Sequence, residues 1–268
     1  GGVGKSTIAS NISVELAKMG FSVGILDADI YGPSIPLMMD VENMKPLSIN
    51  EGDKVKIKPI ENYSVKILSI GFFTKPSQAV IWRGPMAAKA LNQMIFDSAW
   101  GKLDFLIIDL PPGTGDIHLS IVQSLPLDGA VVISTPQNVA LEAARKGISM
   151  FTQENINVPV LGIIENMSYF SPKEFPDKKY FIFGKSGAKN LSVDLDVPFL
   201  GEIPIEETIR EAGDFGRPVS LQKNTDISES ISSITRNMIT QLLKRNKNLP
   251  PTEIVKITNM SGCSAIKK

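Results

Sequence analysis

The chain has 268 residues, of which 43% are hydrophobic and 21% are charged. These values are typical of a globular protein with a sizeable core and exclude a disordered chain. Lysine and arginine together number 28, as do aspartate and glutamate, so the formal net charge is zero. A neutral chain has no global electrostatic attraction to nucleic acid or anionic lipid, and we expect neither a nucleic-acid nor a membrane partner.

The cysteine content also limits the protein class. Cys263 is the one cysteine in the sequence, so no disulfide can form within the chain. This composition fits a reducing compartment. No apolar run approaches the roughly 20 residues that span a bilayer, and the first residues lack the basic and then apolar pattern of a signal peptide. We therefore predict a cytoplasmic location.

The chain begins with GGVGKST, a glycine-rich run that leads into a helical pattern over residues 6–19. Glycine allows backbone N–H groups to approach a phosphate chain, and the first turn of the helix adds unpaired N–H groups and a positive dipole end. The Lys5 amine can reach the β- and γ-phosphates, and the Ser6 hydroxyl can bind Mg²⁺. We predict a phosphate loop for ATP with Lys5 as a catalytic cation, formed by Gly1, Gly2, Val3, Gly4, Lys5, Ser6 and Thr7.

The full phosphate-loop pattern has another glycine five positions before Gly4, which falls before residue 1. We expect the strand that delivers the loop to lie there as well, outside the printed sequence.

Further along the chain, short apolar segments alternate with helical patterns. Strands are expected at residues 22–27, 105–109, 129–134 and 158–165, each buried on both faces, and helices at 85–98 and 138–153. This alternation predicts βαβ units. The expected fold is a three-layer α/β/α P-loop NTPase with a mostly parallel central sheet.

Other segments differ from this pattern. Residues 40–64 are polar and suggest an excursion with a small hairpin, and residues 171–180 form a second polar loop. An isoleucine-rich stripe near the end predicts a helix packed on the domain. We assign the P-loop ATPase domain to residues 1–245 and a C-terminal tail to 246–268.

Two of the expected strands end in aspartates. Asp27 and Asp29 follow the strand at 22–27, and Asp109 ends the strand at 105–109 before a proline- and glycine-rich turn. A carboxylate at the end of a strand beside a phosphate loop fits a Mg²⁺ site, and the turn after it can sense the γ-phosphate. The sequence therefore predicts that Ser6, Asp27 and Asp109 hold Mg²⁺.

Five motifs occur in order: GGVGKST at 1–7, DADIYGPS at 27–34, WRGPM at 82–86, DLPPGTGD at 109–116 and ENMSYF at 165–170. Together they resemble the Mrp/ApbC family, P-loop ATPases of the MinD, ParA and nitrogenase-iron-protein superclass that are associated with iron–sulfur cluster carriage. The resemblance covers essentially the whole chain. It implies a slow, switch-type ATP hydrolase that forms a homodimer across the nucleotide and serves iron–sulfur scaffold or apo-protein clients.

The resemblance also implies roles for individual residues. Asp29 would orient the attacking water and Asp27 would assist Mg²⁺. Asn166 would hydrogen-bond the adenine, and Pro204 would lie near the rim of a segment, 201–219, that wraps the base.

The chain departs from the family at the cluster ligands. Many members follow the NMSYF motif with a CxxC pair, and two such pairs hold a bridging [4Fe–4S] cluster in the dimer. Here residues 166–184 contain no cysteine, and Cys263 gives a dimer two thiolates rather than the usual four. Cys263 is either a cluster ligand, supplemented by a client or small molecule, or an incidental free cysteine.

Two other functions share part of this pattern. A ParA- or MinD-like positioning ATPase that binds DNA or membrane has the same loop and acidic strand ends, but it predicts a basic surface or an amphipathic anchor. A nitrogenase-like electron donor needs two cysteines per subunit. His118, the one histidine in the sequence, follows the 109–116 motif at an expected helix start. A metal role is not supported by neighbouring ligands, and a part in relaying the nucleotide state is an alternative that no motif supports.

Overall fold

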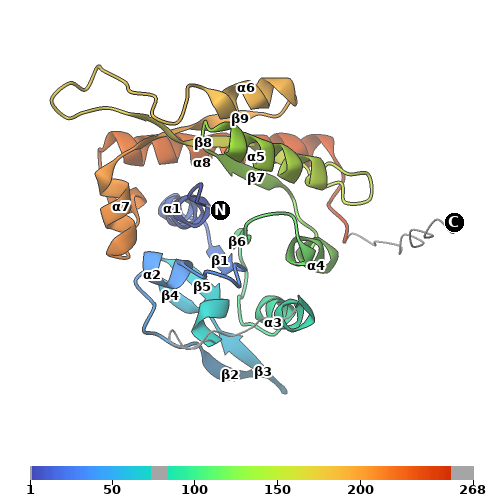
Figure 1. The fold of residues 1–268 in the computed structure, drawn as a ribbon. Helices are drawn as coiled ribbons and strands as arrows, with labels where there is room; N and C mark the ends of the chain where they lie inside the picture. The colour runs from blue at the N-terminus through green and yellow to red at the C-terminus, as the bar shows by residue number, and fades with distance from the viewer. Residues whose placement is uncertain (1, 74–83, 255–268) are drawn as a thin grey trace, which may run out of the picture.

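The computed structural model describes residues 2–73 and 84–254 (Figure 1). The strands are β1 (Val23–Asp27), β2 (Leu47–Glu51), β3 (Lys54–Lys58), β4 (Ile60–Asn62), β5 (Val65–Ser69), β6 (Phe105–Asp109), β7 (Ala130–Ser134), β8 (Val160–Phe170) and β9 (Phe199–Ile205). The α-helices are α1 (Lys5–Lys18), α2 (Ile35–Met38), α3 (Gly84–Phe96), α4 (Asp116–Ser124), α5 (Asn138–Phe151), α6 (Gly187–Asp194), α7 (Glu207–Asp214) and α8 (Asp226–Asn248). Two short 3₁₀ turns are η1 (Ile70–Phe73) and η2 (Val219–Leu221).

Most of the strands run parallel. One sheet has the order β4-β5-β1-β6, in which β4 alone is antiparallel to its neighbour, and another has the parallel order β7-β8-β9. The excursion at 40–64 contains the expected hairpin, formed by β2 and β3.

Helices cover both faces of the sheets, which confirms the three-layer α/β/α fold. On one face, α1 packs on β1, β5 and β6, and it also contacts α8, which covers β8 and β9. On the other face, α3 and α4 pack together over the first sheet, while α5 and α6 cover β7 and β8. Figure 1 shows α1 between the two sheets, with α3 and α4 on the opposite side of β6.

Burial differs between the central strands. All five residues of β1 are buried, because β1 has a partner on each side. In β6 and β7 four of five residues are only half-buried, which corrects the expectation of full burial for these two segments. The reason is that each has a single partner strand within residues 2–73 and 84–254.

The strand expected at 158–165 is longer than its sequence pattern indicated. β8 continues through the ENMSYF motif to Phe170, with Met167 at a positive φ of 56° and a register shift against β9. The motif is therefore part of the sheet. No helix in the described part of the chain is long and apolar enough to cross a membrane.

The isoleucine stripe lies where it was expected. Ile227, Ile231, Ile234 and Met238 are buried on the inner side of α8. Thr225 begins this helix with a capping box: its hydroxyl accepts from the Ser228 N–H, and its own N–H donates to the Ser228 hydroxyl, both at 3.2 Å. Such caps supply partners for N–H groups that the first turn leaves unpaired.

Replacing this cap tests its share of the stability. Thr225→Ala is expected to lower the free energy of unfolding by about 1 kcal/mol, because the capping hydrogen bond is lost. Urea unfolding measures the change. Thr240→Ala is the matched control, since its hydroxyl bonds the Arg236 carbonyl on the exposed side of the same helix. An equal loss in both variants would contradict the role of the cap.

Candidate functional site

The glycine loop ends at the N-terminus of α1. Gly4 is the N-cap residue and has the left-handed backbone φ of 86°, and Gly2 has a φ of 83°. No side chain among the described residues caps this helix end, and no acidic residue occupies its first turn. The first-turn N–H groups and the positive dipole end are thus available to an anion. Gly1 lies outside the described residues.

A side chain from β8 holds this loop in place. Nδ2 of Asn166 donates a hydrogen bond to the Val3 carbonyl at 2.9 Å, and Asn166 is buried. A Cβ on Gly4 would lie 2.4 Å from this Nδ2 atom. Gly4 is therefore required both by its backbone conformation and by the close approach of Asn166. The structure assigns the Asn166 amide to the loop, and its contact with adenine stays a prediction.

Asp27 ends β1 in a fully buried position. Its carboxylate accepts hydrogen bonds from the Ser69 hydroxyl at 2.9 Å and from the N–H groups of Asp29 and Ile35 at 3.2 Å. Burial, together with the charge of Asp109, raises the pKa of Asp27 to about 7 despite these hydrogen bonds. Two carboxylates that share one buried site cannot both ionise without cost.

Asp109 is the register partner of Asp27 and ends β6. Burial raises the pKa of Asp109 to about 6, while a hydrogen bond from Ser6 and the ammonium of Lys5 act in the opposite direction. Its Oδ2 atom is buried and has no hydrogen-bond partner within residues 2–73 and 84–254. The fold thus brings the predicted metal residues Ser6, Asp27 and Asp109 together at the carboxyl ends of β1 and β6.

The chemistry of this edge fits Mg²⁺. Magnesium is usually bound by one or two carboxylates together with phosphate oxygens and water, rather than by a cage of protein ligands. Among the described residues, no group of three or more His, Cys, Asp or Glu side chains could hold a metal ion. The buried Oδ2 of Asp109, which has no partner among the described residues, lies beside a predicted phosphate loop. This oxygen could therefore serve as a ligand for Mg²⁺.

Asp29 lies two residues beyond the end of β1. Its Oδ1 accepts from the N–H groups of Tyr31 and Gly32 at 3.1 and 3.3 Å, which fixes the side chain in a local turn. It is half-buried, and its charge acts on Asp109. Its predicted role in orienting water is therefore compatible with its place beside the carboxylate pair.

The remaining predicted residues are placed as follows. Pro204 is buried on β9, directly after Ile203, which is the register partner of Asn166. The Thr7 hydroxyl lies 4.0 Å from the sulfur of Met38 on α2. Cys263 and the first two residues of the WRGPM motif lie outside the described part of the chain.

Two residues near the site were not identified as functional from the sequence. Ser69 ends β5 and is the register partner of Asp27, so a polar residue at the end of an apolar strand was the available signal. His118 is buried in α4, and burial together with the Lys5 ammonium lowers its pKa.

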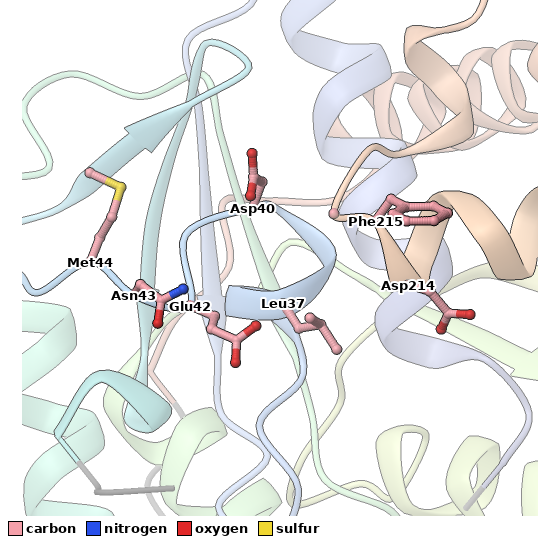
Figure 2. Close-up of a pocket in the computed structure, with 8 residues that line it drawn as sticks. Leu37, Asp40, Glu42, Asn43, Met44, Asp214 and Phe215 are labelled. Carbon is pink, nitrogen blue, oxygen red and sulfur yellow. The ribbon is translucent and has the colours of Figure 1, made fainter.

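A cavity lies apart from this site, between α2 and α7 (Figure 2). It has a volume of about 360 Å³ and is lined by acidic and apolar side chains, among them Asp40, Glu42 and the exposed Phe215. None of its lining residues belongs to the glycine loop or to the aspartates at the strand ends. We therefore do not assign the phosphate groups to it.

The two loop glycines provide a matched pair of substitutions. Gly2→Ala and Gly4→Ala both place a side chain at a positive φ, but a Cβ at Gly2 meets no atom within 4 Å. Gly4→Ala is expected to weaken Mg-ATP binding at least about tenfold more than Gly2→Ala, since it also breaks the Asn166 hydrogen bond. Isothermal titration calorimetry measures both. Equal losses would show that the Asn166 contact has no part in shaping the loop.

The buried carboxylates predict a pH dependence of stability. A carboxyl group whose pKa is raised on folding favours the native state at low pH, and this stabilisation is lost as the pH rises through the folded value. With folded pKa values of about 7 and 6 for Asp27 and Asp109, against an ordinary value of 3.8, the loss begins near pH 4 and is complete by about pH 8. In EDTA, the free energy of unfolding should fall by on the order of 4 kcal/mol between pH 5 and 8.

Urea unfolding at a series of pH values measures this change. Asp109→Asn should flatten the profile, because it removes one raised carboxyl and its charge beside Asp27. Stability that rises between pH 5 and 8 in wild-type protein, or an unaltered profile in the variant, would contradict the assigned pKa shifts.

Comparison with known proteins agrees with this geometry. A family model described as a ParA-type NUBPL iron-transfer P-loop NTPase matches residues 1–239. The chain is 45% identical over 239 residues to an iron-sulfur cluster carrier protein of Synechocystis, covering 89% of this chain and 67% of that protein. It is 44% identical to an iron-sulfur cluster transfer protein NUBPL of Dictyostelium discoideum, covering 90% and 74% of the two chains.

Solved structures show the same fold. A nucleotide-binding protein from Archaeoglobus fulgidus, in complex with ADP, is 36% identical, covers 84% of this chain and 86% of its own, and superposes with a TM-score of 0.72. The cell division ATPase MinD of Pyrococcus furiosus has a TM-score of 0.62 at 21% identity, with 90% and 94% covered, and shows the fold alone. The resemblance drawn from the motifs is thus confirmed, and the chain belongs to the NUBPL iron-transfer P-loop NTPases of the ParA family.

Proposed function

We propose that the protein is a Mg²⁺-dependent ATPase that forms a homodimer across its nucleotide and carries iron–sulfur clusters to client proteins in the cytoplasm. The observation that carries this proposal is the meeting of the glycine loop with the buried Asp27 and Asp109. The start of α1 offers backbone N–H donors for phosphate. Beside it, Oδ2 of Asp109 has no hydrogen-bond partner among the described residues.

Each residue of the site then has a distinct part. The N–H groups at the start of α1 bind phosphate oxygens, and the Lys5 ammonium neutralises charge that develops on the transferred phosphoryl group. The Ser6 hydroxyl and the Asp109 carboxylate, which are hydrogen-bonded to each other, would hold Mg²⁺, and Asp27, which is hydrogen-bonded by Ser69, would assist. Bound Mg²⁺ would supply positive charge that offsets the two buried carboxylates.

Asp29 is assigned to the attacking water. It follows the buried strand end, it is half-buried, and its Oδ1 is oriented by two backbone N–H groups. A carboxylate in this place can accept a hydrogen bond from water and hold it in line with the γ-phosphate. The expected chemistry is positioning and electrostatic stabilisation, which suits a slow switch.

The iron–sulfur cluster is treated as cargo. Clusters are commonly held by four thiolates, and this chain supplies one cysteine, Cys263. Two copies of residues 1–268 therefore supply two, and a client, a scaffold or a small thiol would supply further ligands. The names of the relatives support cluster transfer as the role, and the ligand count favours a cluster shared with a partner.

Replacing Asp29 separates binding from hydrolysis. Asp29→Asn should lower kcat for Mg-ATP by about 100-fold or more, because the group that orients water is lost, while the affinity for Mg-ATP changes by less than about fivefold. Phosphate release and calorimetry measure the two effects. Asp40→Asn is the control, an exposed aspartate outside the site. Unchanged hydrolysis in Asp29→Asn would remove this residue from the mechanism.

Cluster carriage is tested on the same protein. Anaerobic reconstitution with iron and sulfide, in the presence of glutathione and an apo-ferredoxin acceptor, should give ATP-responsive cluster transfer that Cys263→Ser reduces. If no cluster is bound or transferred with any nucleotide, the carrier part of the proposal fails, whereas the ATPase part is judged by the Asp29 experiment.

A further inference from the structure

His118 is a buried polar residue that the proposed mechanism does not yet use. It is the third residue of α4, which begins directly after the turn at 110–115, and its backbone N–H donates to the Gly115 carbonyl at 3.0 Å. It is the one histidine in the sequence, and 5% of it is exposed. This turn begins directly after Asp109, the carboxylate assigned to the metal. His118 therefore follows the end of the segment that we expect to sense the γ-phosphate.

One ring atom of His118 has no partner. Its Nδ1 is buried and makes no hydrogen bond to any group within residues 2–73 and 84–254. Leaving a buried polar atom unpaired costs about 1–3 kcal/mol, so native proteins seldom keep one without a reason. An isoleucine or leucine could be buried here without this cost, as Ile117 and Ile121 are elsewhere on the same helix.

The surroundings favour the neutral form of this ring. Burial and the positive charge of Lys5 both lower the pKa of His118, and the Gly115 carbonyl opposes them only in part. A neutral imidazole has one N–H donor and one acceptor nitrogen. The ring therefore stands close enough to the phosphate-binding lysine to be affected by its charge, and its Nδ1 atom has no hydrogen-bond partner among the described residues.

We propose that His118 is a positioning residue that couples the turn at 110–115 to the nucleotide, with Nδ1 accepting a hydrogen bond from the turn when the γ-phosphate is bound. This inference rests on the proposed Mg-ATP site. Pro111 and Pro112 have no N–H to offer, so the backbone donors beyond them in the turn are Gly113, Thr114 and Gly115. These three residues are exposed, and Gly113 has a positive φ of 94°, which leaves them able to change conformation.

Three substitutions distinguish this role from simple packing. His118→Asn keeps a hydrogen-bonding atom near the place of Nδ1, His118→Gln keeps one near Nε2, and His118→Leu keeps neither. We expect kcat for Mg-ATP to fall about tenfold or more in the Gln and Leu variants, the equivalent of one lost hydrogen bond, while the Asn variant retains most of it. The dissociation constant for Mg-ATP should change by less than about threefold in all of them. Ile121→Val, in the same helix, is the control for loosened packing.

A spectroscopic readout reports the hydrogen bond itself. Because the chain contains one histidine, the ring ¹⁵N signals of labelled protein are assigned without ambiguity. Addition of Mg²⁺ and a non-hydrolysable ATP analogue should shift the Nδ1 signal, whereas Mg-ADP should leave it near its nucleotide-free position.

The outcomes separate the two proposals. If wild-type protein binds the ATP analogue but the ring signals stay unchanged, or if Asn is no better than Gln, the role of His118 is refuted and the ATPase proposal stands. If wild-type protein binds no Mg-nucleotide, both are refuted. Should the Leu variant fail to fold, the comparison of Asn with Gln still decides.

Discussion

The hydrogen bond from Asn166 to the Val3 carbonyl joins the β7-β8-β9 sheet to the glycine loop. Asn166 belongs to β8, whereas the loop leads to Ser6, which bonds the Asp109 carboxylate on β6. No strand pairs β6 with β7 within residues 2–73 and 84–254. At this edge the two sheets are connected by the loop, by α1 with its contact to α8, and by core residues shared between the sheets.

The base of α1 is fixed in a similar way. Oδ1 of Asn11, on α1, accepts hydrogen bonds from the backbone N–H and the hydroxyl of Ser220, both at 2.9 Å, and Lys18 donates to the Ser220 carbonyl. These buried contacts tie the helix to η2, just before α8. Because fully paired buried networks are rigid, α1 holds its N-terminus at a defined place between the sheets. A phosphate group bound there would lie next to the glycine loop, which β8 contacts through Asn166, and next to Asp109 at the end of β6.

The two adjacent buried carboxylates, Asp27 and Asp109, destabilise the site when both are ionised. Both side chains are buried, and the charge of Asp109 makes the ionisation of Asp27 more costly. A site of this kind is less stable empty than occupied, and a cation or a nearby ammonium offsets the repulsion. Lys5 acts on both Asp109 and His118, which flank the turn at 110–115, so a nucleotide bound by Lys5 would alter the electrostatics at both ends of this turn.

Much of this arrangement could be predicted from the sequence. The glycine loop, the helix after it, and the apolar strands ending in aspartate are encoded by local patterns, and α1, β1 and β6 were confirmed within one or two residues. The half-burial of β6 and β7 depends on which strands pair, which no local pattern encodes. β9 was missed because Gly201 and Pro204 interrupt its apolar run. The Asn166–Val3 bond joins residues 163 positions apart, so only the folded chain reveals it.

The central claim is that the loop and the Lys5 ammonium bind the phosphates of a magnesium nucleotide. Isothermal titration calorimetry with Mg-ATP, on folded wild-type protein and on Lys5→Ala, tests it most directly. Saturable binding at one site per chain, weakened at least about 100-fold by the substitution, is the predicted result, because the lysine supplies a charge-assisted contact to phosphate. Binding of equal strength in both proteins, or none in either, would contradict the account.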